Sequence, residues 1–266
     1  MSRFLVVSKL DRLQEYKAIA DTYGVGFEIN DFYEPRVLDD EKEQSRMVEK
    51  YLENGVPDDS TMHGAFLDVV VFSSDERIAE ISKVRMRQSV EIAKKLGVKG
   101  VVFHTNCNPM LAGDIYDNNV VSKTVAFMEE LLQELLEEHS SMQLYLENMF
   151  DDSPKILVEI SQHLCKYQNY GVCLDYAHAS ISTVPMSDWV DALAPYLKHI
   201  HINDNDLKKD LHGALGTGQI DWNQFVKYYH THFDQCSVLI EATEPEAQIQ
   251  SLNYLKENFV GLFREC

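Results

Sequence analysis

Residues 100–150 contain GVVFHTN (100–106), VVSKTVAFMEELLQELLEEHS (120–140) and QLYLENMF (143–150). The first and third segments are short and apolar, which is typical of buried strands. The second segment repeats apolar residues at the i, i+3, i+4 spacing of an amphipathic helix. A strand, a helix and a second strand in this order predict a parallel βαβ unit.

The same alternation extends in both directions along the chain. Six further strands are predicted at residues 4–9, 25–32, 62–71, 171–179, 198–204 and 237–243. Further helices are predicted at residues 11–24, 41–55, 73–97, 153–169, 185–198, 221–233 and 245–263. Eight such units in 266 residues predict an α/β fold in which a single (β/α)8 TIM barrel spans residues 1–266.

The composition is that of a globular protein with an acidic excess. The chain has 45% hydrophobic and 25% charged residues, which excludes a disordered or collagen-like chain. It carries 24 Lys and Arg against 43 Asp and Glu, a formal net charge of −19. This charge disfavours binding to a nucleic-acid backbone, since that binding needs a broad basic surface.

The cysteines and the apolar runs indicate the cellular compartment of the protein. The five cysteines are widely spaced without a CxxC pair, which is typical of reduced thiols in the cytosol. The first residues carry too short an apolar run for a secretory signal. No apolar stretch approaches the roughly 18 residues of a membrane helix. We therefore expect a cytoplasmic protein that does not enter a membrane.

Polar side chains stand at or near the ends of the predicted strands. They are His63, His104, Glu147, Asp175, His178, His201 and Glu241, together with Asp210 and His212 in the loop after the seventh strand. In a TIM barrel the carboxyl ends of the strands meet at the face that carries the active site. Imidazole and carboxylate groups are ligands for zinc, manganese or iron. The sequence therefore predicts a divalent metal site at this face.

The remaining histidines are interpreted as structural. His139, His163, His230 and His232 lie on predicted helices. His199 lies two residues before His201 on the same predicted strand. We expect one of this pair to face the helix layer, and we assign that position to His199.

Several of these segments resemble the xylose isomerase-like TIM barrel superfamily. They are MHGAFLD (62–68), VVFHTN (101–106), LENMF (146–150), GVCLDYAHAS (171–180), HIHINDND (199–206), DLHGALGTGQIDW (210–222) and LIEAT (239–243). The most specific motifs are the D-x-x-H of Asp175 to His178 and the D-x-H-x-x-x-G-x-G of Asp210 to Gly218. The superfamily contains sugar isomerases and epimerases, and also the endonuclease IV type of apurinic endonuclease.

The resemblance implies a ligand set that both branches share. Endonuclease IV holds three zinc ions, and the nine counterparts of its ligands are His63, His104, Glu147, Asp175, His178, His201, Asp210, His212 and Glu241. The epimerase branch holds one metal ion, and its ligands correspond to Glu147, Asp175, His201 and Glu241. In that branch His178 and His63 would contact the substrate. The implied cofactor is therefore one to three divalent ions, zinc or manganese.

The surrounding residues resemble the isomerase and epimerase branch more closely. The loop after the seventh strand is short, and Thr105-Asn106 follow His104 where endonuclease IV has proline and glycine. The arginine that ketose epimerases place after the strand-seven histidine is absent from NDLKK (205–209), so Lys208 or Lys209 would replace it, and we assign the substrate contact to Lys208.

Together these features predict a metal-dependent sugar or sugar-phosphate isomerase or epimerase that transfers a proton next to a carbonyl. Glu147 and Glu241 would be its catalytic residues. The expected partner is a small sugar-like substrate, and the acidic net charge makes a nucleic acid the less favoured one. The alternative is an endonuclease IV-like metal-dependent phosphodiesterase.

Overall fold

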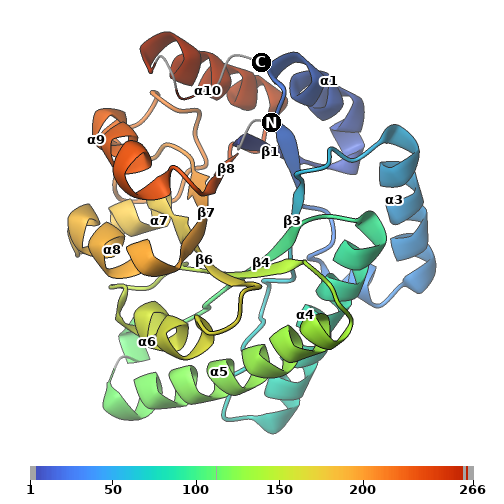
Figure 1. The fold of residues 1–266 in the computed structure, drawn as a ribbon, viewed down its shortest axis with the longest axis vertical. Helices are drawn as coiled ribbons and strands as arrows, with labels where there is room; N and C mark the ends of the chain where they lie inside the picture. Colours follow the sequence, from blue (N-terminus) through green and yellow to red (C-terminus); the bar gives the residue numbers. More distant parts are fainter. Residues whose placement is uncertain (1–3, 112, 260–261, 263–266) are drawn as a thin grey trace.

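Eight parallel strands form a closed barrel in the computed structural model, which describes residues 4–111, 113–259 and 262 (Figure 1). The strands follow one another in chain order around the barrel. They are β1 Phe4–Ser8, β2 Gly26–Ile29, β3 Thr61–His63, β4 Gly100–His104, β5 Gln143–Glu147, β6 Tyr170–Asp175, β7 Leu197–Ile202 and β8 Ser237–Ile240. The predicted (β/α)8 TIM barrel is confirmed.

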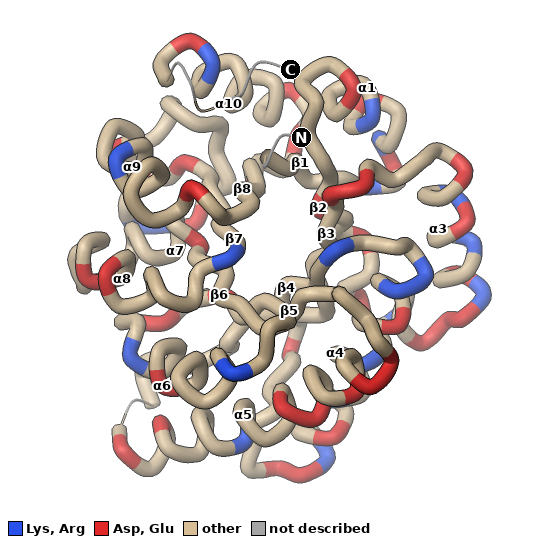
Figure 2. The backbone as a smooth tube through the Cα atoms, viewed as in Figure 1, with Lys and Arg blue, Asp and Glu red and all other residues tan. Residues whose placement is uncertain are grey.

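The α-helices lie outside the ring of strands, as Figure 1 shows. They are α1 Leu13–Tyr23, α2 Pro35–Leu38, α3 Glu41–Asn54, α4 Glu76–Leu96, α5 Asp114–Glu137, α6 Lys155–Leu164, α7 Tyr176–Ile181, α8 Met186–Leu193, α9 Trp222–Tyr228 and α10 Pro245–Asn258. The acidic residues are spread over these outer helices (Figure 2). Within the described ranges, no helix is both long enough and apolar enough to span a membrane.

Local signals in the sequence place several helix ends. Gly24 and Gly97 follow α1 and α4 in the left-handed conformation, with φ of 66° and 71°, and thereby end these helices as predicted. Asp75 begins α4, because its carboxylate accepts the backbone N–H of Arg77.

The predicted strand at 62–71 is wrong after His63. β3 ends there, and residues 64–75 form a loop that buries Ala65, Val69, Val71 and Phe72 and leaves Leu67 exposed. Serine hydroxyls of α4 supply hydrogen-bond partners to the loop backbone. Ser89 accepts a hydrogen bond from the N–H of Ala65, and Ser82 accepts one from the N–H of Val70. The apolar run favoured a strand because burial alone does not distinguish a strand from a packed loop.

The predicted strand at 171–179 is wrong after Asp175. The strand β6 ends at Asp175, and the helix α7 begins at the next residue. The Asp175 carboxylate caps this helix by accepting the N–H of His178 at 2.7 Å. The D-x-x-H motif is therefore a strand-to-helix turn that brings His178 back over the end of the barrel.

Candidate metal centre

Four buried side chains meet at the carboxyl ends of β5 to β8. We call Glu147, Asp175, His201 and Glu241 the four-ligand cluster, because one candidate ligand atom from each lies within 4.8 Å of the others. His201 Nδ1 is 3.2 Å from Glu147 Oε1 and 3.5 Å from Glu241 Oε2. The spacing lets one cation contact all four side chains.

Glu147 is shared with a second group on the neighbouring strands. His63, His104 and Glu147 also offer ligand atoms within 4.8 Å of one another. The Nε2 atoms of His63 and His104 are 3.1 Å apart, and they lie 3.7 and 3.4 Å, respectively, from Glu147 Oε2. We call this group the histidine-pair cluster.

A third group lies toward the solvent. Asp210 Oδ2 is 3.2 Å from His178 Nε2 and 2.7 Å from His212 Nε2. Burial disfavours the charged imidazole of His212, but Asp210 and Glu241 outweigh it and raise the pKa of His212 to about 10. His178, Asp210 and His212 form the outer cluster, so the structure brings together all nine candidate ligands at one face.

The four-ligand cluster has the unsatisfied groups that a cation would satisfy. Both carboxylate oxygens of Glu147, Asp175 Oδ2 and Glu241 Oε2 are buried without a hydrogen-bond partner among the described residues. Burial raises the pKa of Asp175 well above its ordinary value, and the carboxylates of Glu241 and Glu147 add to this rise. Buried carboxylates this close are costly unless a positive charge compensates them, so the donor set fits a divalent ion.

Backbone carbonyls fix the orientation of three candidate ligands. Nδ1 of His63, His178 and His212 each lies 3.0 Å from a backbone oxygen. A carbonyl oxygen only accepts hydrogen bonds, so each Nδ1 must carry the proton and donate it. When such an imidazole is neutral, as it must be to bind a metal, its lone pair is on Nε2, which faces the site in all three residues.

The loop that carries Asp210 and His212 is held by Asp204. The buried Asp204 carboxylate accepts hydrogen bonds from the N–H groups of Asn205, Gly216 and Ile220 and from the indole of Trp222, at 2.8 to 3.2 Å. A Cβ atom at Gly218 would collide with this carboxylate. The G-x-G portion of the motif therefore shapes the loop.

We expect Asp204→Ala to lower the free energy of unfolding by about 3–5 kcal/mol, because it leaves several buried donors unpaired. Urea denaturation measures the change. Asp206→Ala is the matched control, since Asp206 accepts two backbone N–H groups from the same loop in an exposed position. The control should cost no more than about 1 kcal/mol. Equal losses in the two variants would contradict the role assigned to Asp204.

A cavity of about 520 Å³ opens beside the outer cluster. Its lining includes His178, Asp210, Phe150 and the exposed Lys208 and Lys209. The structure thus places Lys208 at the rim of this cavity, next to two candidate ligands.

Sequence reasoning missed Glu28 and misplaced His199. Glu28 on β2 lies inside the barrel, 3.1 Å from His199 Nε2 and 3.2 Å from His201 Nε2. His199 therefore faces the barrel interior and not the helix layer, because residues two apart on a strand point to the same face. The signal for Glu28 was available as one acidic residue within the apolar strand VGFEIND.

The chain is similar to known proteins over most of its length. The family described as xylose isomerase-like TIM barrel matches residues 12–258. The uncharacterized protein MJ1311 of Methanocaldococcus jannaschii is 24% identical over 205 residues, which cover 74% of this chain and 68% of that protein.

Two solved structures share the fold. The TTHB071 protein of Thermus thermophilus, in crystals soaked with ZnCl2, is 20% identical with a TM-score of 0.76, covering 96% of this chain and 98% of that one. A D-tagatose 3-epimerase-like protein is 22% identical with a TM-score of 0.75, covering 97% of this chain and 96% of that one.

Proposed function

Because the chain belongs to the xylose isomerase-like TIM barrel family, we propose that it is a metal-dependent isomerase or epimerase of a small sugar or sugar phosphate. The observation that carries this proposal is the four-ligand cluster, in which two carboxylates contact one imidazole at the end of the barrel. The fold shared with a D-tagatose 3-epimerase-like protein supports a sugar as the substrate class.

The four-ligand cluster would hold the ion. A bound divalent ion supplies Lewis-acid polarisation of a carbonyl and the adjacent hydroxyl. Glu147 and Glu241 come from β5 and from the end of β8, so they approach a substrate from two directions. Glu241 is the more accessible of the two, with a side chain 10% exposed against 0% for Glu147.

Glu241 would remove the proton from the carbon next to the carbonyl. Glu147 would take the proton of the adjacent hydroxyl and deliver it to that carbon from the other side, and Glu241 would pass the proton that it removed to the hydroxyl oxygen. His178 would orient a substrate oxygen, and Lys208 would contact a second oxygen from the rim of the cavity. The burial of Glu147 and Glu241 limits the access of water to the proton being transferred.

We expect Glu241→Gln to slow the exchange of substrate hydrogen with solvent deuterium by about 10²-fold, because the amide cannot accept the proton. The measurement is NMR of D-tagatose and D-fructose incubated in D2O with the Mn²⁺-loaded protein. Glu244→Gln is the matched control, because Glu244 is exposed, lies three residues away and pairs with Arg12 at the surface. Undiminished exchange in Glu241→Gln would contradict the assignment.

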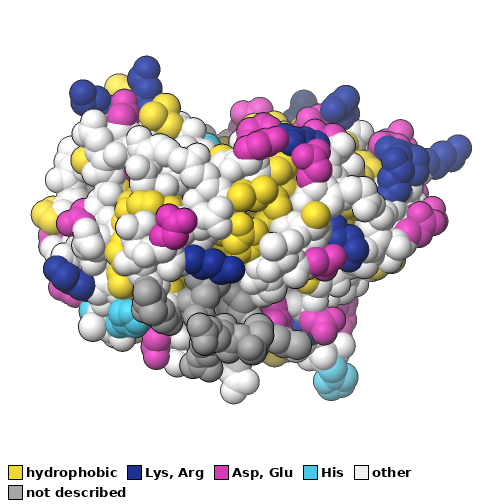
Figure 3. Space-filling view, turned by 90° about the horizontal axis from the view of Figure 1, so that it is seen from above, with side chains coloured by type: hydrophobic (Ala, Val, Ile, Leu, Met, Phe, Trp, Pro, Cys, Tyr) yellow, Lys and Arg dark blue, Asp and Glu magenta, His cyan; other side chains and the backbone are white. Residues whose placement is uncertain are grey.

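A second candidate function is metal-dependent phosphodiester hydrolysis. It is favoured by the histidine-pair and outer clusters, since one ion cannot contact all nine candidate ligands. It is disfavoured by the net charge of −19. On the side of the barrel that Figure 3 shows, the described acidic and basic side chains are interspersed without a continuous basic area. Two results together would favour phosphodiester hydrolysis over isomerisation. They are a content of about three zinc ions per chain in elemental analysis and cleavage of a DNA duplex that carries an abasic site.

A further inference from the structure

Glu28 lies directly below the four-ligand cluster, within the barrel. Its Oε1 is 3.2 Å from His201 Nε2, and its Oε2 is 3.1 Å from His199 Nε2. The hydroxyl of Thr61 donates to Oε2 at 2.7 Å. Glu28, His199 and His201 are buried, so this carboxylate acts on His201 without screening by solvent.

His201 is oriented differently from the other candidate ligands. His63, His178 and His212 turn Nε2 toward the site and anchor Nδ1 on backbone carbonyls. His201 turns Nδ1 toward Glu147 and Glu241, and its Nε2 lies at ion-pair distance from Glu28, without the alignment of a hydrogen bond. Within the described part of the chain, His201 is the one candidate ligand whose distal nitrogen faces a carboxylate on the side away from the site.

We propose that Glu28 is a positioning residue that holds His201 with its proton on Nε2 and its lone pair on Nδ1, directed into the four-ligand cluster. An imidazole that binds an ion through Nδ1 must carry its proton on Nε2. A carboxylate partner at that proton also makes the imidazole a stronger donor to the ion. The inference rests on the metal centre proposed above and holds for either reaction.

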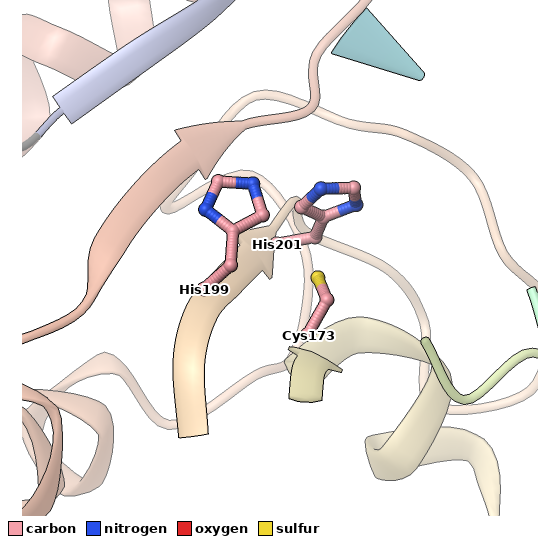
Figure 4. Close-up of side chains that lie close together, drawn as sticks. All are labelled: Cys173, His199 and His201. Atoms are coloured by element: carbon pink, nitrogen blue, oxygen red, sulfur yellow. The ribbon is translucent and has the colours of Figure 1, made fainter. Parts of the chain in front are cut away.

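The same region offers one competing arrangement. Figure 4 shows Cys173, His199 and His201 close together, and their ligand atoms lie within 4.8 Å of one another. Since Nδ1 of His201 faces Glu147 and Glu241, the nitrogen left for a metal ion there would be Nε2. Glu28 already lies against that nitrogen, and both nitrogens of His199 have partners in Glu28 and Ser237. The contacts therefore favour Glu28 as an anchor over a thiolate site below the centre.

The test is Co²⁺ titration of the metal-free full chain, followed by visible absorption. We expect Glu28→Gln to weaken Co²⁺ binding by about 10–100-fold, the range for loss of an outer partner of a metal ligand. Ser237→Ala is the matched control, since it removes a hydrogen bond from the same buried network and leaves Glu28 against His201. The control should bind Co²⁺ within about twofold of the wild type.

The possible results separate the inference from the proposed function. Failure of the wild-type chain to bind Co²⁺ would contradict the proposed metal centre itself. A folded Glu28→Gln chain that binds Co²⁺ as tightly as the wild type overturns only the role of Glu28. A thiolate-to-cobalt charge-transfer band that is present in the wild type and lost in Cys173→Ala also overturns it, because Cys173 would then be a ligand.

A measurement on the wild-type chain covers the case in which Glu28→Gln does not fold. NMR of the cadmium-113-loaded protein with nitrogen-15 histidine reports which nitrogen of His201 is bound. We expect coupling of cadmium to Nδ1 and a solvent-protected proton on Nε2. Coupling of cadmium to Nε2 overturns the proposal.

Discussion

Replacing Glu147 with glutamine is expected to weaken metal binding by more than about 100-fold, above the usual effect of losing an outer partner. Glu147 belongs to both the four-ligand and the histidine-pair clusters, so one substitution removes a charged ligand from each. An amide also cannot transfer the proton that we assign to this carboxylate. Deuterium exchange into substrate should therefore fall by about 10⁴-fold, the upper end of acid–base contributions.

Elemental analysis after dialysis measures the first effect, and NMR in D2O measures the second. Glu244→Gln again provides the control, because it removes the same charge from the surface. Full metal content together with undiminished exchange in the Glu147→Gln protein would contradict both roles assigned to Glu147. Full metal content with lost exchange would retain its catalytic role and remove its role as a ligand.

Removing the metal is expected to lower the melting temperature by about 8–16 °C. An ion present at about 1,000 times its Kd stabilises the folded state by roughly 4 kcal/mol, because the unfolded chain lacks the site. For a chain of this size each kcal/mol shifts the melting temperature by about 2–4 °C.

Thermal unfolding with and without EDTA measures this shift, and added Zn²⁺ or Mn²⁺ should reverse it. In the Glu147→Gln chain the EDTA-dependent shift should almost disappear, which separates specific binding from general effects of the chelator. Identical melting temperatures of the wild type in the two conditions would contradict the metal centre.

The barrel could be predicted from the sequence because its strands and helices have different hydrophobic periods. Gly24 and Gly97 mark two helix ends, since a left-handed residue after a helix favours glycine. The errors arose where burial has another cause. Residues 64–71 include buried apolar side chains of a packed loop, and residues 176–179 belong to a helix that Asp175 starts.

The candidate site could be predicted as a set of residues but not as a geometry. The positions of His104, Glu147 and Glu241 at strand ends predicted that they lie at one face, but this pattern gave no distances between them. The anchors of the histidines were not predictable, because backbone carbonyls have no sequence signal. Glu28 could have been found, because it is the penultimate residue of a buried strand. A buried carboxylate needs a polar partner, so its presence there indicates a polar contact inside the barrel.

The anchors also determine how the centre responds to mutation. Every amino acid supplies a backbone carbonyl, so no single substitution at Gly64, Asn148 or Glu241 deletes the acceptors that orient three of the imidazoles. The acceptor that faces His201 is the side-chain carboxylate of Glu28, so a single substitution can remove it. A substitution at position 28 can therefore change the affinity for the ion without replacing any of the ligand residues.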